Sequence, residues 1–227
     1  NEKNPEITGA FSQAMHSLMD VLPISPFIGS NSWVLGADKT KNGKVIFAND
    51  PHIGYSQPSV WYQAHIKTPN YEMYGFHLAL IPFPLLGHNK DYAYGLTMFE
   101  NDDIDFYVEK NNPKNKNEYK FKEAYFEYNT IEKRLKIKDA QDSLYTIKVS
   151  KHGPLMNGVI EHLEDENPIA MQWIYTKIDN KMLAVAYEIS HANSLADFKK
   201  GASKLHAPGL NMMYGDAKNN IAWFASG

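Results

Sequence analysis

The sequence predicts an α+β fold in which antiparallel strands dominate. Apolar and polar residues alternate in many short runs from Trp33 onward, which is typical of strands. Helical spacing of apolar residues is confined to segments near the two ends of the chain. With 227 residues and 43% hydrophobic content, the chain can bury the core of one large domain or of two modest ones.

The first predicted element is an amphipathic helix over residues 6–22, which stops at Pro23. A loop containing Pro23 and Pro26 then leads to Gly29 and Ser30. From there the alternation predicts a series of strands at 33–37, 44–49, 60–66, 71–80, 92–99, 104–110, 119–128, 131–138, 144–150 and 169–175.

Helical periodicity returns near the C-terminus. It predicts helices over 181–190 and 194–205, the second capped by Ser194, followed by a strand pair at 211–216 and 220–225. The charged stretch 109–140 is typical of an exposed hairpin excursion. No internal repeat interrupts this order.

Composition excludes several classes of function. The 23 basic and 26 acidic residues are mixed along the chain and leave a net charge of −3, so we expect no nucleic-acid or membrane-surface partner. No apolar run approaches the roughly 18 residues of a membrane span. The absence of cysteine excludes disulfides, thiolate catalysis and Cys-ligated zinc, and leaves the compartment open.

The chain begins at Asn1, without an initiator methionine and without a charged-then-apolar signal segment. It is therefore expected to be either a matured polypeptide or a piece cut from a longer one. We favour the second explanation.

Ser30 follows a glycine and precedes a predicted strand, in the sequence IGSNSW. A serine hydroxyl is a weak nucleophile unless a base takes its proton, and one such base is a free α-amino group. If the Gly29–Ser30 bond were cut, Ser30 would carry its own amine, with an ordinary pKa of about 7.7–8.0. A turn or helix-cap serine is the plainer explanation.

Several blocks, taken together, resemble one family. GSNSWVLGADKTKNGKVIFANDPHIG (29–54) is similar to the start of the catalytic β-chain of penicillin acylases. These are N-terminal nucleophile hydrolases, a group that includes cephalosporin and acyl-homoserine-lactone acylases. The likeness continues in the same order through YEMYGFHLALIPFPLLGHN (71–89), GLTMFENDDIDFY (95–107), KHGPLM (151–156) and LNMMYGDAKNNIAWFASG (210–227).

The resemblance implies a four-layer αββα sandwich of two stacked antiparallel sheets flanked by helices. Residues 1–29 would be the end of a removed spacer, and 30–227 the N-terminal part of the catalytic β-chain. The family's α-chain is missing, and the likeness stops just before a segment where the family usually carries a catalytic-site arginine. This chain alone is therefore expected to be inactive. Members are exported, so a periplasmic or other exported location is implied.

The resemblance also assigns catalytic roles. Cleavage between Gly29 and Ser30 would make Ser30 the N-terminal nucleophile, with its own amine as base. His52 matches a position that holds this amine or the bound amide. The main-chain N–H of Met98 and the side-chain amide of Asn211 match the oxyanion donors. Each residue also has an ordinary explanation: a satisfied histidine, a core methionine, or a turn asparagine.

Two further sites follow from the resemblance. Asp102, the carbonyl of Ile104 and Asp105 match a structural calcium site to which the α-chain adds an acidic ligand; the reaction itself requires no cofactor. A run of charges such as ENDDID (100–105) is otherwise more often solvated.

Ile53, Leu86 and Leu96 match the acyl-binding pocket. Their aliphatic character, together with His52, favours aliphatic acyl groups and cephalosporin or lactone acylase-like substrates over penicillin G. The plainer explanation is that they belong to the core.

The function indicated is hydrolysis of a linear amide bond in an N-acylated small molecule through an acyl-enzyme on Ser30. Two alternatives remain open. One is a catalytically silent, β-rich binding or scaffold module, which an uncut Gly29–Ser30 bond would favour. The other is a metal-dependent hydrolase using Asp50, His52 and the acidic cluster, which inhibition by chelators would favour. Asp50-Pro51-His52 is also typical of a turn.

Overall fold

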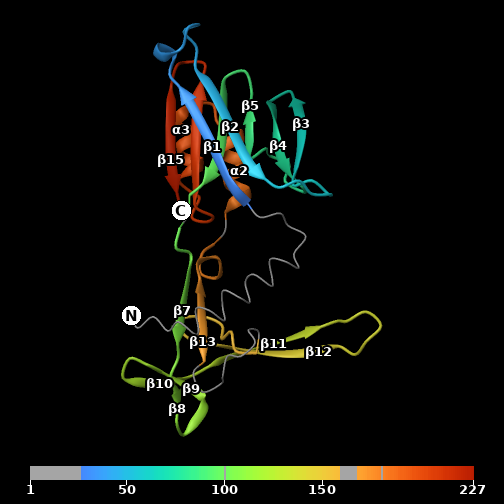
Figure 1. The fold of residues 1–227 in the computed structure, drawn as a ribbon, viewed down its shortest axis with the longest axis vertical. Coiled ribbons are helices and arrows are strands. Elements are labelled where there is room, and N and C mark those ends of the chain that lie inside the picture. The colour runs from blue at the N-terminus through green and yellow to red at the C-terminus, as the bar shows by residue number, and fades with distance from the viewer. Residues whose placement is uncertain (1–26, 100, 159–167, 180) are drawn as a thin grey trace. The chain divides into compact units, whose positions relative to one another are not determined.

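A computed structural model describes residues 27–99, 101–158, 168–179 and 181–227 of the chain (Figure 1). These residues form two compact units. We call the described residues of Pro23–Asn101 and Ile178–Gly227 the sandwich unit, and those of Asp102–Lys177 the ribbon unit. The predicted helix over 6–22 lies outside the described residues.

The sandwich unit is built on a six-stranded antiparallel sheet. Its strands, in spatial order, are β15 (Ile221–Ser226), β14 (Leu210–Asp216), β6 (Tyr92–Met98), β5 (Leu86–His88), β4 (Tyr71–Leu78) and β3 (Trp61–Thr68). A second sheet contains β1 (Phe27–Leu35) and β2 (Ile46–Ile53), joined by a loop with a 3₁₀ turn at Ala37–Lys39. This pair packs across β6, β14 and β15.

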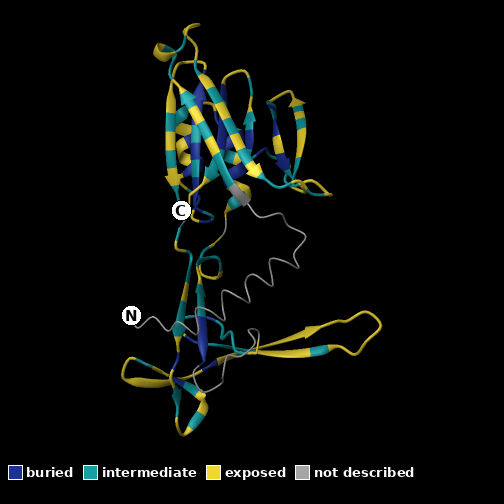
Figure 2. Ribbon diagram, in the orientation of Figure 1, coloured by how far each residue is buried: buried dark blue, intermediate teal, exposed yellow. Residues whose placement is uncertain are grey.

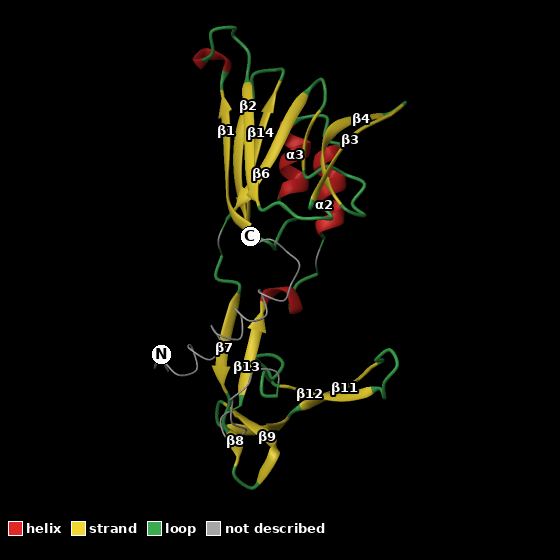
Figure 3. Ribbon diagram, turned by 45° about the vertical axis from the view of Figure 1, so that its right-hand side comes forward, coloured by secondary structure: helices red, strands yellow, loops and turns green. Residues whose placement is uncertain are grey.

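Two helices cover the opposite face of the six-stranded sheet: α2 (Met182–Ser190) and α3 (Leu195–Ala202). Figure 3 shows the order of layers, with β1 and β2 on one side of β6 and β14 and the helices on the other. Ser194 caps α3 as predicted, because its Oγ accepts a hydrogen bond from the Asp197 N–H at 3.1 Å.

The core lies between this sheet and the helices. Phe198 of α3 is fully buried and contacts the rings of three tyrosines and one phenylalanine: Tyr92, Tyr94, Tyr214 and Phe224. The Tyr92 hydroxyl donates to the Ile189 carbonyl at 2.8 Å, and the Tyr94 hydroxyl to the Pro84 carbonyl at 2.6 Å. Burial raises the pKa of both hydroxyls, so they remain neutral donors.

The outer face of the β1–β2 pair is bare within the described residues. Trp33, Leu35 and Ile46 are each about half exposed there. Of the four predicted layers, the described residues thus supply one helical layer and both sheets.

The ribbon unit consists of short antiparallel ribbons. β7 (Ile104–Val108) pairs with β13 (Ile169–Trp173), which a 3₁₀ turn at Ile174–Thr176 follows. β9 (Asn115–Phe121) lies between β8 (Asn111–Asn112) and β10 (Ala124–Glu127), and β11 (Asn129–Leu135) pairs with β12 (Ser143–Val149). Figure 2 shows that the β11–β12 ribbon is largely exposed.

Most predicted strands are confirmed, with two corrections. The single strand predicted over 119–128 is a hairpin, because the chain turns at Lys122, which has a positive φ of 55°. Asp50-Pro51-His52 is not a turn but continues β2 to Ile53. None of the described helices has the length and apolar character that crossing a membrane requires.

Candidate functional site

Ser30 lies within β1, where it pairs with Pro51 of β2. Its Oγ accepts a hydrogen bond from the backbone N–H of Met98 at 3.3 Å. Met98 is the last residue of β6, in the other sheet. The packing of the two sheets therefore brings together the predicted nucleophile and the predicted backbone donor, which lie 68 residues apart in the sequence.

Asn211 joins the same place from β14, opposite Thr97 of β6. Its side-chain Nδ2 donates to the carbonyl oxygen of Met98 at 2.9 Å. Met98 thus contacts both predicted partners, because its N–H donates to Ser30 Oγ and its carbonyl accepts from Asn211. The structure therefore places Ser30, Met98 and Asn211 in one chain of hydrogen bonds, and their catalytic roles stay a prediction.

His52 lies beside the Gly29 end of the predicted cleavage bond. The two residues are cross-strand partners, and a Cβ added at Gly29 would sit 3.9 Å from Nδ1 of His52. The other ring nitrogen, Nε2, is 2.9 Å from Oδ2 of Asp50. Both side chains are about half exposed or more, so the pair is solvated. His52 is near the peptide bond but makes its hydrogen bond to Asp50, not to the Ser30 hydroxyl.

Asn49 is a residue that the sequence interpretation missed. Its Nδ2 donates to the carbonyl of Asn31 at 3.0 Å and to that of Leu96 at 3.2 Å, so one amide joins β1 to β6 close to Ser30 and Met98. Its Oδ1 is buried and has no hydrogen-bond partner among the residues that the structure describes. Gly95 makes room for it, because a Cβ there would lie 1.8 Å from this oxygen. The signal available was a polar residue among the otherwise apolar inward-facing positions of β2.

A cavity of about 610 Å³ opens between β2 and the six-stranded sheet. Pro51, the cross-strand partner of Ser30, lines it. Leu86 lines it too, but Ile53 and Leu96 do not; Leu96 packs against the core beside α2 and α3. Much of the remaining lining is aromatic, from Phe47, Trp61, Tyr74, Phe76 and Tyr94. Of the three aliphatic residues expected to line an acyl pocket, this cavity thus contains Leu86 alone, and the aliphatic acyl preference stays a prediction.

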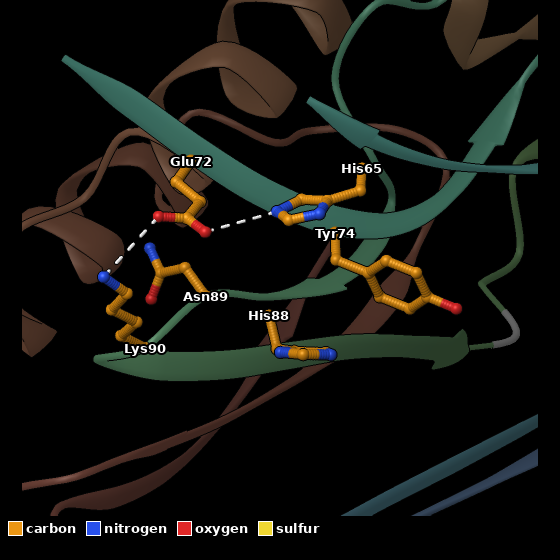
Figure 4. Close-up of a pocket in the computed structure, with 6 residues that line it drawn as sticks. All are labelled: His65, Glu72, Tyr74, His88, Asn89 and Lys90. Carbon is orange, nitrogen blue, oxygen red and sulfur yellow. Dashed lines mark hydrogen bonds and ion pairs between the residues drawn. The ribbon is translucent and has the colours of Figure 1, made fainter. Parts of the chain in front are cut away.

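A second hollow, of about 410 Å³, adjoins this cavity and shares Tyr74 and His88 with it (Figure 4). Its carboxylate, Glu72, lies within 4 Å of basic side chains: His65 Nε2 at 3.3 Å, Lys67 Nζ at 3.1 Å and Lys90 Nζ at 3.9 Å. The hydrogen bond from Lys67, followed by the charges of Lys67 and Lys90, lowers the pKa of Glu72. Glu72 is therefore an ion-paired carboxylate and not a proton carrier at neutral pH.

The predicted calcium ligands lie in the ribbon unit. Asp102 and Asp105 are exposed, and Ile104 pairs with Trp173 at the end of β7. Within the described ranges, no three His, Asp or Glu side chains converge as metal ligands would. Described side chains alone therefore do not build the predicted calcium site, nor a metal centre around Asp50 and His52.

Comparisons with known proteins extend this picture. Residues 3–227 match the family model for penicillin amidase. The chain is 26% identical over 208 residues to the acyl-homoserine lactone acylase QuiP of Pseudomonas aeruginosa, covering 87% of this chain and 24% of that protein. It is 28% identical over 131 residues to the penicillin acylase 2 proenzyme of Pseudomonas sp. strain SE83, covering 57% of this chain and 17% of that protein.

Among solved structures, a thermostable penicillin G acylase from Alcaligenes faecalis superimposes with a TM-score of 0.75 at 22% identity, over 86% of this chain and 35% of that one. This match confirms the predicted N-terminal nucleophile hydrolase fold. The chain spans about a quarter or less of the length of the curated relatives given above. With a family model that matches nearly its whole length, the chain belongs to the penicillin amidase family.

Proposed function

We propose that this chain carries the nucleophile of an enzyme that hydrolyses a linear amide bond in an N-acylated substrate. The observation that carries the proposal is that Met98 bonds both other residues: its N–H donates to Ser30 Oγ, and its carbonyl accepts from the Asn211 amide. Acyl transfer requires a nucleophile with hydrogen-bond donors near it, and Met98 and Asn211 would supply them.

Activation would begin with cleavage of the Gly29–Ser30 bond. Before the cut, Ser30 has no amine; afterwards its α-amino group, with an ordinary pKa of about 7.7–8.0, can accept the Oγ proton. His52 lies beside this bond and is held by Asp50, which supports a role in fixing the new amine or the bound amide. A relative named a proenzyme is consistent with such processing.

The reaction would proceed in two steps. Ser30 Oγ attacks the amide carbonyl, its proton passes to the α-amine and then to the leaving nitrogen, and the C–N bond breaks to leave an acyl ester on Ser30. Water then hydrolyses the ester by the same proton route. The Met98 N–H and the free N–H of Asn211 would stabilise the oxyanion, a contribution of typically about 2.7–4 kcal/mol for one donor.

The acyl group would enter the cavity that Pro51 and Leu86 line. Its apolar lining suits an apolar acyl chain, and the many rings around Leu86 make an aromatic group as suitable as an aliphatic one. The preference for aliphatic groups that the sequence suggested depended on Ile53, Leu86 and Leu96 together with His52, and of these only Leu86 lines the cavity.

Three further features remain proposals. A second chain, corresponding to the family's α-chain, would cover the exposed outer face of β1 and β2, where Trp33, Leu35 and Ile46 are half exposed. A structural calcium ion at Asp102, Ile104 and Asp105 would need ligands beyond the described residues. An exported location is proposed from the family alone.

The experiment that tests the proposal compares Ser30→Ala with Ser32→Ala in the full-length protein. Ser32 is a matched control because it lies on the same strand and its Oγ bonds only the Ala48 carbonyl, at 3.2 Å. We expect Ser30→Ala to lower kcat for an N-acyl amide by at least about 10³-fold, and Ser32→Ala to leave it nearly unchanged. Undiminished activity in Ser30→Ala would contradict the proposal. A wild-type protein without activity would favour a silent module, and loss of activity with a chelator would favour metal catalysis.

An acyl-length series on one amine, with phenylacetyl included, tests the cavity assignment. Each buried methylene contributes about 0.8 kcal/mol, so kcat/KM should rise stepwise with chain length until the cavity is filled. Leu86→Ala should move the optimum to a larger acyl group. An unchanged optimum would show that the acyl chain lies elsewhere.

A further inference from the structure

The side-chain amide of Asn211 is held from both ends. Its Nδ2 donates to the Met98 carbonyl at 2.9 Å, and its Oδ1 accepts from the indole Nε1–H of Trp223, also at 2.9 Å. A carbonyl oxygen can only accept and an indole N–H can only donate. The two partners therefore fix which end of the amide carries the nitrogen.

This orientation decides what the site can offer a ligand. The amide nitrogen has two N–H groups, and the Met98 carbonyl uses one of them, which leaves the second as a donor. A flipped amide would set its oxygen against the Met98 carbonyl and turn its nitrogen toward the indole N–H. It would remove the donor and place two acceptors in contact.

Trp223 does not hold this place as a core residue. It lies on β15, where it pairs with Met213, and its side chain reaches back to Asn211 two positions along β14. It is 65% exposed, so apolar burial explains little of its position. Its polar contact with Asn211 is the interaction that the described structure shows for its indole nitrogen.

We propose that Trp223 is a positioning residue that locks the Asn211 amide with its N–H toward the carbonyl oxygen of the substrate. The inference rests on the proposed function, because it concerns the oxyanion site assigned there. Trp223 touches no reacting atom; it acts through Asn211. Without the indole N–H, only the Met98 carbonyl selects the productive orientation.

The test is a double-mutant cycle in the processed, full-length enzyme, using one N-acyl amide substrate. Trp223→Phe keeps the ring and removes the N–H, and we expect it to lower kcat about three- to tenfold, the effect of one neutral hydrogen bond, with KM within about twofold. Asn211→Ala should lower kcat by roughly 10²-fold or more. In the double variant, the tryptophan change should have no further effect, because its partner is gone.

Two controls separate positioning from a loss of stability. Trp173→Phe removes an indole N–H in the ribbon unit and should leave kcat unchanged. Incorporation of 3-benzothienylalanine at position 223 keeps the shape of the indole and replaces the N–H by sulfur, so it should reproduce the loss seen with Trp223→Phe. Thermal unfolding of each variant verifies that it is folded at the assay temperature.

Each remaining outcome has one meaning. If Trp223→Phe is as active as the wild type while Asn211→Ala is severely impaired, the inference is wrong and the proposed function stands. If Asn211→Ala is itself active, the oxyanion assignment is wrong and the inference falls with it. Losses that multiply in the double variant, or a rise confined to KM, would show that Trp223 acts by another route, such as contact with the leaving group.

Discussion

The two units of the chain differ in what supports their strands. In the sandwich unit, α2 and α3 back the six-stranded sheet, and Phe198, Tyr94, Tyr214 and Met212 are almost completely buried. In the ribbon unit, every residue of β10 and β11 is exposed. The groups with a proposed catalytic role come from strands of the sandwich unit, where packing can hold side chains from different strands at hydrogen-bond distance.

The ribbon unit also contains residues capable of chemistry, but they contact one another. Glu109 is 2% exposed, and its Oε1 lies 2.9 Å from Nδ1 of His152. The His152 ring stacks on Tyr107 at a centroid distance of 4.0 Å. This arrangement connects the end of β7 to the loop after β12. Polar residues there stabilise the ribbons and are not expected to affect hydrolysis.

The largest expected contrast comes from one phenylalanine in each unit. Phe198→Ala should cost about 3–5 kcal/mol of unfolding free energy, because it leaves a cavity among four rings in the core. Phe126→Ala removes a side chain that is 49% exposed and should cost about 1 kcal/mol or less. Denaturant unfolding of the full-length protein measures both; equal losses would contradict the contrast between the units.

A pair of glycines sharpens the comparison. A Cβ at Gly95 would lie 1.8 Å from Asn49 Oδ1, and a Cβ at Gly153 would lie 2.0 Å from the Met171 carbonyl. Each alanine substitution should cost about 1–3 kcal/mol through overpacking. Only Gly95→Ala should also lower kcat, because it displaces the amide that joins β1 to β6. If Gly153→Ala also lowers kcat, when equal amounts of folded protein are compared, the expected difference between the two glycines is wrong.

A double variant distinguishes the position of Asn49 from crowding alone. Asn49→Ala with Gly95→Ala removes the clash, so stability should recover relative to Gly95→Ala. Activity should stay low, since the carbonyls of Asn31 and Leu96 have lost their common donor. Recovery of both stability and kcat would show that Asn49 has no role in aligning the two strands.

The smallest expected effect concerns Asp216, which accepts hydrogen bonds in the β14–β15 turn. Burial alone would raise its pKa, but bonds from Asn220, Tyr214 and Lys218 outweigh burial and lower it. Because the folded-state pKa lies below the ordinary value of 3.8, the stabilisation is complete above that value and is lost as the pH falls through the folded-state pKa.

Asp216→Asn should therefore lower the free energy of unfolding near neutral pH. It should also make that free energy fall less steeply as the pH is lowered through the acidic range. Asp142→Asn, in the exposed β11–β12 turn, is the control. Urea unfolding between about pH 3 and 7 gives the profile. If the free energy of unfolding of Asp216→Asn depends on pH below 4 as steeply as that of the wild type, Asp216 does not have the lowered pKa.

Local signals explain what the sequence predicts well. The helix over 195–202 follows from its Ser194 cap and its apolar spacing, and most strands follow from alternation, because both depend on neighbours in the chain. The meeting of Ser30, Met98 and Asn211 was predicted through the family resemblance, since no local pattern links residues so far apart.

Long-range packing explains what could not be predicted. Leu96 packs against the core beside α2 and α3, but alternation along β6 does not reveal which face of the sheet the helices cover. Its absence from the cavity could therefore not be predicted from the sequence. Trp223 and Asn211 meet only because β15 pairs with β14 in one register. No glycine or proline marks the turn at Lys122, where the adjacent charged residues Lys122 and Glu123 interrupt the alternation.

The central claim is that Ser30 becomes an N-terminal nucleophile, and intact-mass analysis with N-terminal sequencing of the purified full-length protein tests it most directly. We predict a polypeptide that begins at Ser30 in the wild type and in Ser32→Ala, and an uncut Gly29–Ser30 bond in Ser30→Ala. A natively folded wild-type protein that hydrolyses N-acyl amides with this bond intact, or cleavage of Ser30→Ala at the wild-type rate, would contradict the account.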